Sequence, residues 1–169
     1  MEEVKNTRIV VEETSNIKKE VEKMNIKVVT GGILEKDGKF LLVQENQKIC
    51  KGKWNIPAGG LNENESLIES AKREIFEETG CKVEVTGILE IANEILEGIN
   101  VVSFFFDTKI IDENLNADGN EITNVKWFTY EEILNMRDEL RANGYFISTI
   151  KNKIDNKIQP IEIIKFTKK

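Results

Sequence analysis

The sequence predicts one domain of the α+β or mixed α/β class, and two observations support this. The chain has 169 residues, of which 40% are hydrophobic and 32% charged, a composition typical of a single soluble globular domain with its own core. Strand-like segments lie before and after one well-marked central helix, expected at residues 66–79, instead of alternating regularly with helices. We therefore do not expect a regular βαβ winding.

The part of the chain before the central helix is expected to contain a hairpin and a loop. Residues 26–34 are rich in strand-forming side chains, and residues 39–45 have the same character. Asp37-Gly38 stands between these two apolar runs, which is a strong hairpin signal. A loop over residues 51–64, punctuated by glycines, then leads into the helix.

The central helix has a clear beginning and end in the sequence. Ser66 stands three residues before Glu69, the spacing of a capping box, and Gly80 supplies a C-terminal stop. The elements expected after it are strands at 82–91 and 100–110 (the second buried in its middle), a polar loop at 111–122, a strand at 124–129, and helices at 130–140 and 144–153.

The two ends of the chain are expected to lie outside the main domain, which we place at residues 25–155. Residues 1–24 carry Ile17 and Val21 at helical spacing, and we interpret them as an N-terminal arm or a short helix. Residues 156–169 are interpreted as a C-terminal tail or an edge strand.

The composition excludes several kinds of chemistry. The chain has no histidine, which rules out Ser-His triads, His-ligated zinc and histidine general bases. The net charge is −6 and the lysines are scattered, so we do not expect binding to nucleic acid. Cys50 and Cys81 form no CxxC pair, and no apolar run is long enough for a membrane helix. We therefore expect a cytoplasmic protein without a membrane partner.

Three glutamates of the central helix point to a metal site. Glu74, Glu77 and Glu78 stand at i, i+3 and i+4, so a helix places them on one face. Their repulsion costs roughly a few tenths of a kcal/mol per pair in water, and a hard cation such as Mg²⁺ removes this cost while gaining oxygen ligands. A solvated charged face is the alternative interpretation of the same spacing.

The loop before the helix favours the metal site. Residues 54–60, WNIPAGG, bring a backbone with little side-chain bulk in front of the acidic face, so that backbone groups can reach a metal or a phosphate. Loop and helix together resemble the Nudix box: Gly, five residues, Glu, seven residues, Arg-Glu, an aliphatic residue, one residue, Glu-Glu, one residue, Gly and an apolar residue. The positions are filled by Gly59, Glu65, Arg73, Glu74, Ile75, Glu77, Glu78, Gly80 and Cys81.

The resemblance extends beyond the box, over roughly residues 26–150. GKWxIPAGG precedes the box and VKWFxxEEI follows it. Two positions depart from the usual pattern: Cys81 takes the place of the last aliphatic residue, and Asn64 stands where a glycine is often found. The resemblance implies a Nudix fold, an α/β/α sandwich around a mixed sheet, with the box as a loop-helix-loop.

The resemblance also implies roles for the box residues. Glu74, Glu77, Glu78 and the backbone at Gly59 would bind Mg²⁺, with Mn²⁺ as a substitute. Arg73 would orient the acids by salt bridges, and Glu65 would hold the loop to the start of the helix.

The same resemblance implies a hydrolytic mechanism. Mg²⁺ would neutralise charge on a diphosphate while a carboxylate takes a proton from the attacking water. Glu77 or Glu78 could be that base. Glu121 stands on the loop before a late strand, where Nudix proteins often have an acid, and a solvated loop acid is the alternative; Asp118 is a weaker candidate.

The substrate is less clearly indicated than the reaction. The ADP-ribose branch is usually marked by a proline about fifteen residues after the box, and the dinucleoside-polyphosphate branch by a tyrosine slightly farther on; both markers are absent here. This leans toward nucleoside di- or triphosphates, and residues 43–60 are loosely similar to Nudix proteins that hydrolyse 8-oxoguanine nucleoside diphosphates. We expect Gly59, Gly60, Phe104 and Trp127 to contact the substrate.

The sequence therefore predicts a Mg²⁺-dependent pyrophosphohydrolase that acts on a small-molecule nucleotide and releases a nucleoside monophosphate. One alternative is an ADP-ribose or nucleotide-sugar pyrophosphatase, and another is a non-catalytic Nudix domain that senses a nucleotide. By analogy with Nudix dimers, residues 1–24 could embrace a second subunit of a homodimer; a tail without fixed structure is the other interpretation.

Overall fold

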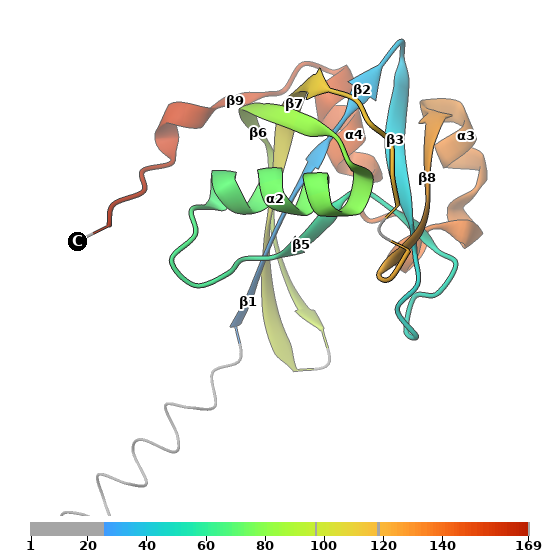
Figure 1. The fold of residues 1–169 in the computed structure, drawn as a ribbon, viewed down its shortest axis with the longest axis horizontal. Helices are drawn as coiled ribbons and strands as arrows, with labels where there is room; N and C mark the ends of the chain where they lie inside the picture. The colour runs from blue at the N-terminus through green and yellow to red at the C-terminus, as the bar shows by residue number, and fades with distance from the viewer. Residues whose placement is uncertain (1–25, 97, 118, 169) are drawn as a thin grey trace, which may run out of the picture.

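The computed structural model describes residues 26–96, 98–117 and 119–168, drawn as a ribbon in Figure 1. The arm expected over residues 1–24 lies outside the described residues. Two sheets and a small number of helices make up the fold. The helices are α2 (Leu67–Thr79), α3 (Tyr130–Asn135) and α4 (Ile147–Ile154), with single 3₁₀ turns at Arg137–Glu139, Arg141–Asn143 and Ile161–Ile163.

The larger sheet is mixed, as the resemblance implied. Its five strands lie in the order β5-β1-β7-β6-β9, and they are β5 (Ala58–Gly60), β1 (Ile26–Ile33), β7 (Ile99–Asp112), β6 (Lys82–Leu96) and β9 (Gln159–Pro160). β1 and β7 run parallel, whereas every other pair in this sheet is antiparallel. The sheet thereby carries β5, the last strand before the central helix, on one of its edges.

The smaller sheet is antiparallel and is centred on β3. It contains β2 (Glu35–Lys36), β3 (Lys39–Glu45), β4 (Trp54–Asn55) and β8 (Ile122–Thr129), with β8 paired to β3. The Asp37-Gly38 turn joins β2 to β3, and both of its residues have positive φ, 53° and 73°. This is the geometry that Asp-Gly favours in tight hairpins, so the predicted turn is confirmed. The strand before the turn is the short β2, however, because β1, which covers most of the expected strand at residues 26–34, pairs with β5 and β7 in the other sheet.

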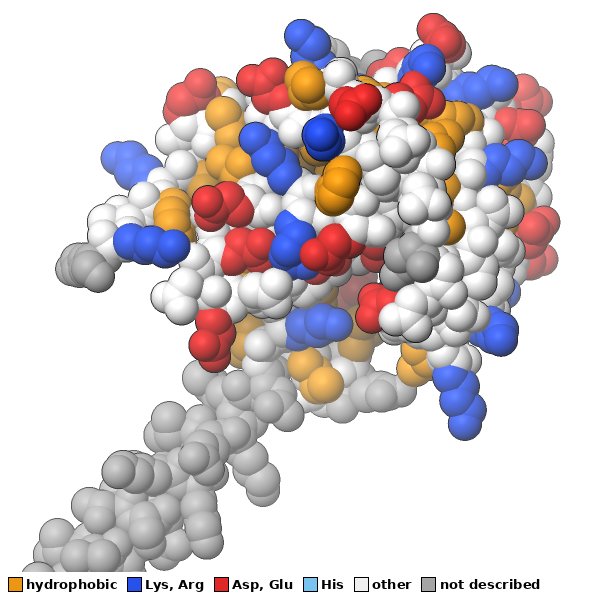
Figure 2. Space-filling view, in the orientation of Figure 1, with side chains coloured by type: hydrophobic (Ala, Val, Ile, Leu, Met, Phe, Trp, Pro, Cys, Tyr) orange, Lys and Arg blue, Asp and Glu red, His pale blue; other side chains and the backbone are white. Residues whose placement is uncertain are grey.

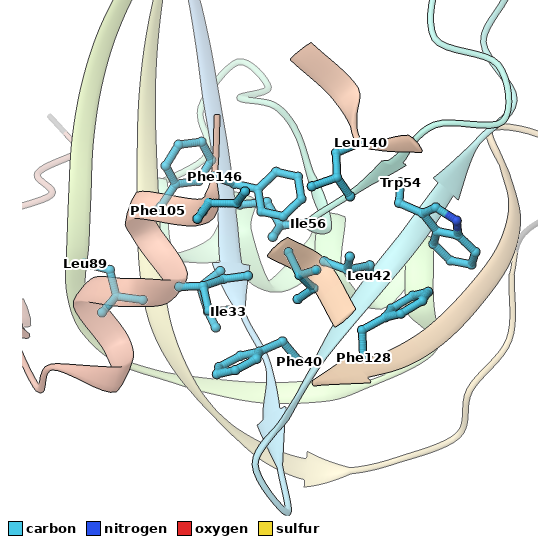
Figure 3. Close-up of a cluster of buried hydrophobic side chains, with 13 residues drawn as sticks. Ile33, Phe40, Leu42, Trp54, Ile56, Leu89, Phe105, Phe128, Leu140 and Phe146 are labelled. Carbon is cyan, nitrogen blue, oxygen red and sulfur yellow. The ribbon is translucent and has the colours of Figure 1, made fainter. Parts of the chain in front are cut away.

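Helices cover both faces of the mixed sheet, which confirms the expected sandwich. Phe105 and Phe106 are adjacent on β7 and both fully buried, but they belong to different clusters, because neighbouring residues of a strand point to opposite faces. Phe106 packs with Ala71 of α2, and Phe105 packs with Ile147 on the α4 side. Figure 3 shows the larger cluster, which also ties the two sheets together through Leu42 of β3.

The elements after the central helix differ from the prediction mainly in length. β6 and β7 extend beyond residues 91 and 100 into one long hairpin, where pairing continues to Leu96 and Ile99. α3 ends at Asn135, not near residue 140, because the chain turns there to bury Leu140 in the core. Among the residues that the structure describes, no helix is long and apolar enough to cross a membrane.

The end of α2 generates a stability prediction. Gly80 has φ 76°, and an added Cβ would lie 2.1 Å from the carbonyl oxygen of Asn114. Gly80→Ala should therefore lower the free energy of unfolding by about 1 kcal/mol for the left-handed backbone, plus about 1–3 kcal/mol for the clash. Gly38→Ala is the control, since Gly38 also has positive φ but open space around the added atom. If Gly80→Ala and Gly38→Ala lowered the free energy of unfolding in urea by the same amount, the clash at Asn114 would be contradicted.

Candidate functional site

The helix that carries the acids is fixed at both ends by local interactions. The Ser66 hydroxyl accepts from the Glu69 N–H and the Glu69 carboxylate accepts from the Ser66 N–H, which completes the expected capping box. The apolar face buries Ala71 and Ile75 against the sheet. With that face buried, the i, i+3, i+4 acids lie along its border, facing the loop that precedes the helix. Acidic and basic side chains stand side by side on the α2 face of the molecule (Figure 2).

The glycine loop approaches the acids as closely as the sequence suggested. A Cβ added at Gly59 would lie 2.1 Å from the Oε2 atom of Glu74, so a larger residue there would displace that carboxylate from its position. The Ala58 N–H donates a hydrogen bond of 2.9 Å to the Glu78 carboxylate. β5 therefore meets the helix directly, with its backbone against two of the three glutamates.

Arg73 links the loop, the start of the helix and the acids. Its Nε and Nη2 atoms donate to the two carboxylate oxygens of Glu65, at 2.8 and 2.9 Å. Its Nη1 atom donates to Glu74 at 2.6 Å and to Glu77 at 3.1 Å, and its Nη2 atom also reaches the Gly60 carbonyl at 2.9 Å. These are the contacts that an orienting arginine requires. The bonds to Arg73 hold the pKa of Glu65 below its usual range.

Asn64, which replaces a glycine frequent in the family pattern, has a local explanation. Its φ is 62°, in the left-handed region that glycine enters without strain. Asparagine tolerates this region better than other residues with a side chain. The departure from the pattern therefore preserves the backbone conformation of the loop.

The acids of the site outnumber the positive charge that Arg73 supplies, and no salt bridge to Glu78 is formed within the described part of the chain. Burial raises the pKa of Glu78 well above its usual value, and the nearby carboxylates of Glu45, Glu74 and Glu121 raise it further, against the opposing bond from Ala58. Burial also raises the pKa of Glu74, and the Arg73 contacts offset this in part. The site is therefore a region of unfavourable negative charge that a cation would relieve.

The side chains as they stand do not converge on one point. Among the residues that the structure describes, no group of three acidic or thiol side chains is arranged to hold a metal ion. Arg73 draws Glu74 and Glu77 toward itself, while Ala58 holds Glu78. A bound cation would have to compete with Arg73 for these oxygens. The donor set itself, carboxylates beside backbone carbonyls, fits a hard cation such as Mg²⁺.

The structure brings Glu121 to the acids of the helix although it lies more than forty residues away in the sequence. Its loop is held to the end of β3, because the Asn46 N–H donates to the Glu121 carbonyl at 2.8 Å and the Asn46 side chain donates to the Asn120 carbonyl at 2.9 Å. The Glu121 carboxylate is exposed and contributes to the raised pKa values of both Glu74 and Glu78. Asp118, the weaker candidate, lies outside the described residues.

The two aromatic residues expected to contact substrate lie on the α2 side of the fold. Phe104 is half-buried against the cluster of Ala71 and Phe106, and Trp127 is half-buried against the cluster of Leu41 and Ile75. Both side chains thus serve packing in this structure, and their contact with substrate stays a prediction.

A polar cluster beside the acids was not anticipated from the sequence. Glu45, at the end of β3, is 5% exposed and accepts from Arg141 Nη1 at 2.7 Å and from the Asn55 side chain at 3.0 Å. The Tyr145 hydroxyl lies close to the Arg141, Asn55 and Glu45 side chains. Glu45 could have been noticed in the sequence, because it is an acid at an inward position of the strand KFLLVQE. Arg141 could not, since it stands 96 residues after Glu45 and no local pattern marks it.

The fold and this acidic helix define a Nudix domain, and the chain belongs to that family: the NUDIX domain model matches residues 24–148. Phosphatase NudJ of Escherichia coli strain K12 is 31% identical over 124 residues, covering 69% of this chain and 79% of NudJ. A NUDIX hydrolase structure from Nitrosomonas europaea superposes with a TM-score of 0.78 at 25% identity, covering 85% of this chain and 98% of that chain.

A human relative is similar over a shorter region. The chain is 34% identical to the 8-oxo-dGDP phosphatase NUDT18 over 64 residues, which cover 38% of this chain and 20% of the human protein. The matches to the first three curated relatives, this one included, cover only 20% to 36% of those proteins' own lengths.

The Arg73 contacts generate a second prediction. Arg73→Lys keeps the charge but cannot serve four acceptors at once, so we expect the free energy of unfolding to fall by about 1–3 kcal/mol. Lys72→Gln is the matched control, because Lys72 is exposed on the same helix turn. A variant as stable as the wild type in urea unfolding would show that the arginine contacts have no net effect on stability.

The half-buried carboxyl of Glu78 generates a third prediction. The raised pKa of Glu78 means that the folded protein favours the protonated carboxyl. The free energy of unfolding therefore has its full contribution from this group below the ordinary pKa of 4.5, and loses that contribution as the pH rises through the raised pKa. Glu78→Gln keeps the acceptor for Ala58 and suffers no such loss. We expect the variant to exceed the wild type by about 1–3 kcal/mol at pH 8, less at pH 5, in urea unfolding with EDTA. Identical curves at pH 8 would refute this.

Proposed function

We propose that this protein is a Mg²⁺-dependent Nudix hydrolase that cleaves a pyrophosphate bond in a nucleoside di- or triphosphate and releases a nucleoside monophosphate. The observation that carries the proposal is the helix face of Glu74, Glu77 and Glu78, seated against the Ala58–Gly60 backbone and linked to it by Arg73. Family membership supports hydrolysis as the reaction class.

The charges of the site support a role for a divalent cation. Glu78 is half-buried among carboxylates, with only the Ala58 N–H donating to it among the described groups, and this arrangement is unfavourable until a cation joins it. Glu74, Glu77, Glu78 and the carbonyl at Gly59 would hold the ion. When bound, Mg²⁺ would supply charge neutralisation at the diphosphate oxygens.

The protein's own residues would orient the substrate and accept the proton. The half-buried backbone of Gly60 has open space beside it, which would leave room for a phosphate close to the acids, whereas the space beside Gly59 is filled by the Glu74 carboxylate. Glu121 is exposed and close to the helix acids, which suits a general base that must reach an attacking water. Glu77, the most exposed of the three box acids, is the other candidate for that role, together with Glu78.

Oxidised guanine nucleotides are the substrates that we would test first. NUDT18 is named for its action on 8-oxo-dGDP, and its match falls on part of this chain. ADP-ribose and nucleotide sugars are the second candidates; the absence of the proline that marks the ADP-ribose branch places them lower. A nucleotide sensor without turnover is the third, and the complete set of box acids argues against it.

Hydrolysis of a nucleotide panel tests the proposal. The panel contains nucleoside di- and triphosphates, 8-oxo-dGDP and ADP-ribose, with Mg²⁺, Mn²⁺ or EDTA, in ¹⁸O-labelled water to identify the bond that breaks. We expect a Mg²⁺-dependent nucleoside monophosphate product, lost in EDTA, and a fall in kcat of roughly 100-fold or more in Glu77→Gln. Glu63→Gln is the control, since Glu63 is exposed on the loop before the helix.

Other outcomes would select other functions. Turnover confined to ADP-ribose would favour the second candidate. Nucleotide binding without turnover of any compound in the panel would favour the sensor. Full activity of Glu77→Gln would contradict the proposed role of the acidic face.

A further inference from the structure

The polar cluster around Glu45 lies close enough to the acids of the helix for the Glu45 charge to act on Glu78. Glu45 raises the pKa of Glu78, and Asn55, which donates to Glu45, stands three residues before Ala58 on the same strand-loop segment. Arg141 donates to the same Glu45 oxygen as Asn55, Oε1, at 2.7 Å. A diphosphate bound at Gly59 and Glu78 would therefore have this cluster as a neighbour.

The cluster has hydrogen-bonding groups without partners. Asn55 Oδ1 is the one buried side-chain polar atom in the described part of the chain that has no hydrogen-bond partner, and Asn55 is 2% exposed. Only the Nη1 atom of Arg141 bonds a described group, although its side chain is 38% exposed. Buried polar atoms in native structures are nearly always paired, so the unpaired oxygen of Asn55 calls for a donor, and the exposed donors of Arg141 beside it are open to a ligand.

The balance of charge in the cluster indicates a neutral ligand group. The salt bridge to Glu45 already compensates the charge of Arg141, and the other nearby charges are the acids Glu78 and Glu94. A phosphate there would meet negative charges with no uncompensated cation. A neutral carbonyl oxygen can accept from the remaining guanidinium donors without this penalty.

Aromatic surface completes the surroundings of the cluster. The half-buried ring of Tyr145 packs against Phe105 and Phe146, with centroid distances of 5.9 and 5.6 Å. Burial raises the pKa of Tyr145 to about 12, so its hydroxyl is neutral near pH 7. A flat ring with polar edges, such as a nucleobase, suits a site with an aromatic wall and a few fixed polar groups.

The segment that carries Arg141 and Tyr145 is held in an unusual conformation. Ala142, Asn143 and Gly144 all have positive φ, at 45°, 54° and 79°. Alanine rarely adopts this region, and such strain is most often retained at binding sites. The three left-handed residues bring both side chains to Glu45 from one short connection between α3 and α4.

We propose that Asn55 and Arg141 read the keto edge of a nucleobase: Asn55 Oδ1 accepts from the ring N–H and Arg141 donates to the adjacent carbonyl oxygen. Guanine, its oxidised forms and uracil present this edge, whereas adenine and cytosine present an amino group beside an acceptor nitrogen. This inference rests on the proposed function for the nucleotide, and it adds the class of base.

The test compares keto and amino nucleotides with the wild type and two variants. Arg141→Lys keeps a cation beside Glu45 but lacks the guanidinium fork, and Arg141→Gln removes both. We expect the ratio of kcat/KM for dGDP over dADP, and for UDP over CDP, to fall roughly tenfold or more in both variants, mainly through KM for the keto nucleotide. Arg137→Gln, at an exposed arginine of the same connection, should leave both ratios unchanged.

The outcomes separate this inference from the function on which it rests. Thermal unfolding monitors folding, and Arg141→Lys should keep its Tm within about 2 °C of the wild type. Unchanged ratios in a folded Arg141→Lys enzyme would overturn the base assignment and leave the hydrolase intact. If the wild type cleaves no nucleotide, calorimetric titration with GMP and AMP decides: tighter GMP binding that Arg141→Lys abolishes supports the inference, and equal or absent binding overturns it.

Discussion

The hydrogen bonds of Arg73 are the interaction on which the rest of the site depends. One guanidinium reaches Glu65 at the beginning of the box, Glu74 and Glu77 on the helix, and the Gly60 carbonyl on β5. Arginine is suited to this because its planar donors point in several fixed directions. Loop, strand and helix are thereby held at the separation that Gly59 permits, with the backbone against the Glu74 carboxylate.

The acids that the site needs for its function lower the stability of the folded protein. Burial of Glu78 among other carboxylates raises its pKa and destabilises the folded protein at neutral pH, whereas Arg73 compensates Glu74 and Glu77 only while no other cation competes for them. Such local cost is common where a site is built to receive a charged ligand. The Glu45 cluster has a different character. Arg141 compensates the charge of Glu45, so that the cluster is left with unused hydrogen-bonding groups instead of an unbalanced charge.

Much of the fold and the centre of the site could be predicted from local sequence. Ser66, Glu69 and Gly80 defined the helix, Asp37-Gly38 defined a hairpin, and the spacing of the glutamates defined their common face. What could not be predicted depends on contacts between distant segments. Arg141 meets Glu45 across 96 residues, and the packing of Phe104 toward α2 follows from the register of β7, which no local pattern specifies. The left-handed residues from Ala142 to Gly144 include an alanine, which gives no turn signal of its own.

The parallel pairing of β1 with β7 has a consequence for how the protein folds. Ile26 faces Asn100, so this ladder closes a long stretch of chain, whereas β6 and β7 form a hairpin from neighbouring residues. Local contacts form quickly and distant ones slowly, so the hairpin is expected to precede the docking of β1. Among the strands that the structure describes, β5 pairs with β1 alone, so the backbone beside the acids is expected to assemble late. A folding intermediate would already contain a capped α2 but would lack the β5 backbone at which a phosphate is proposed to bind. The edge of β7 would still be unpaired, and it could associate with other chains.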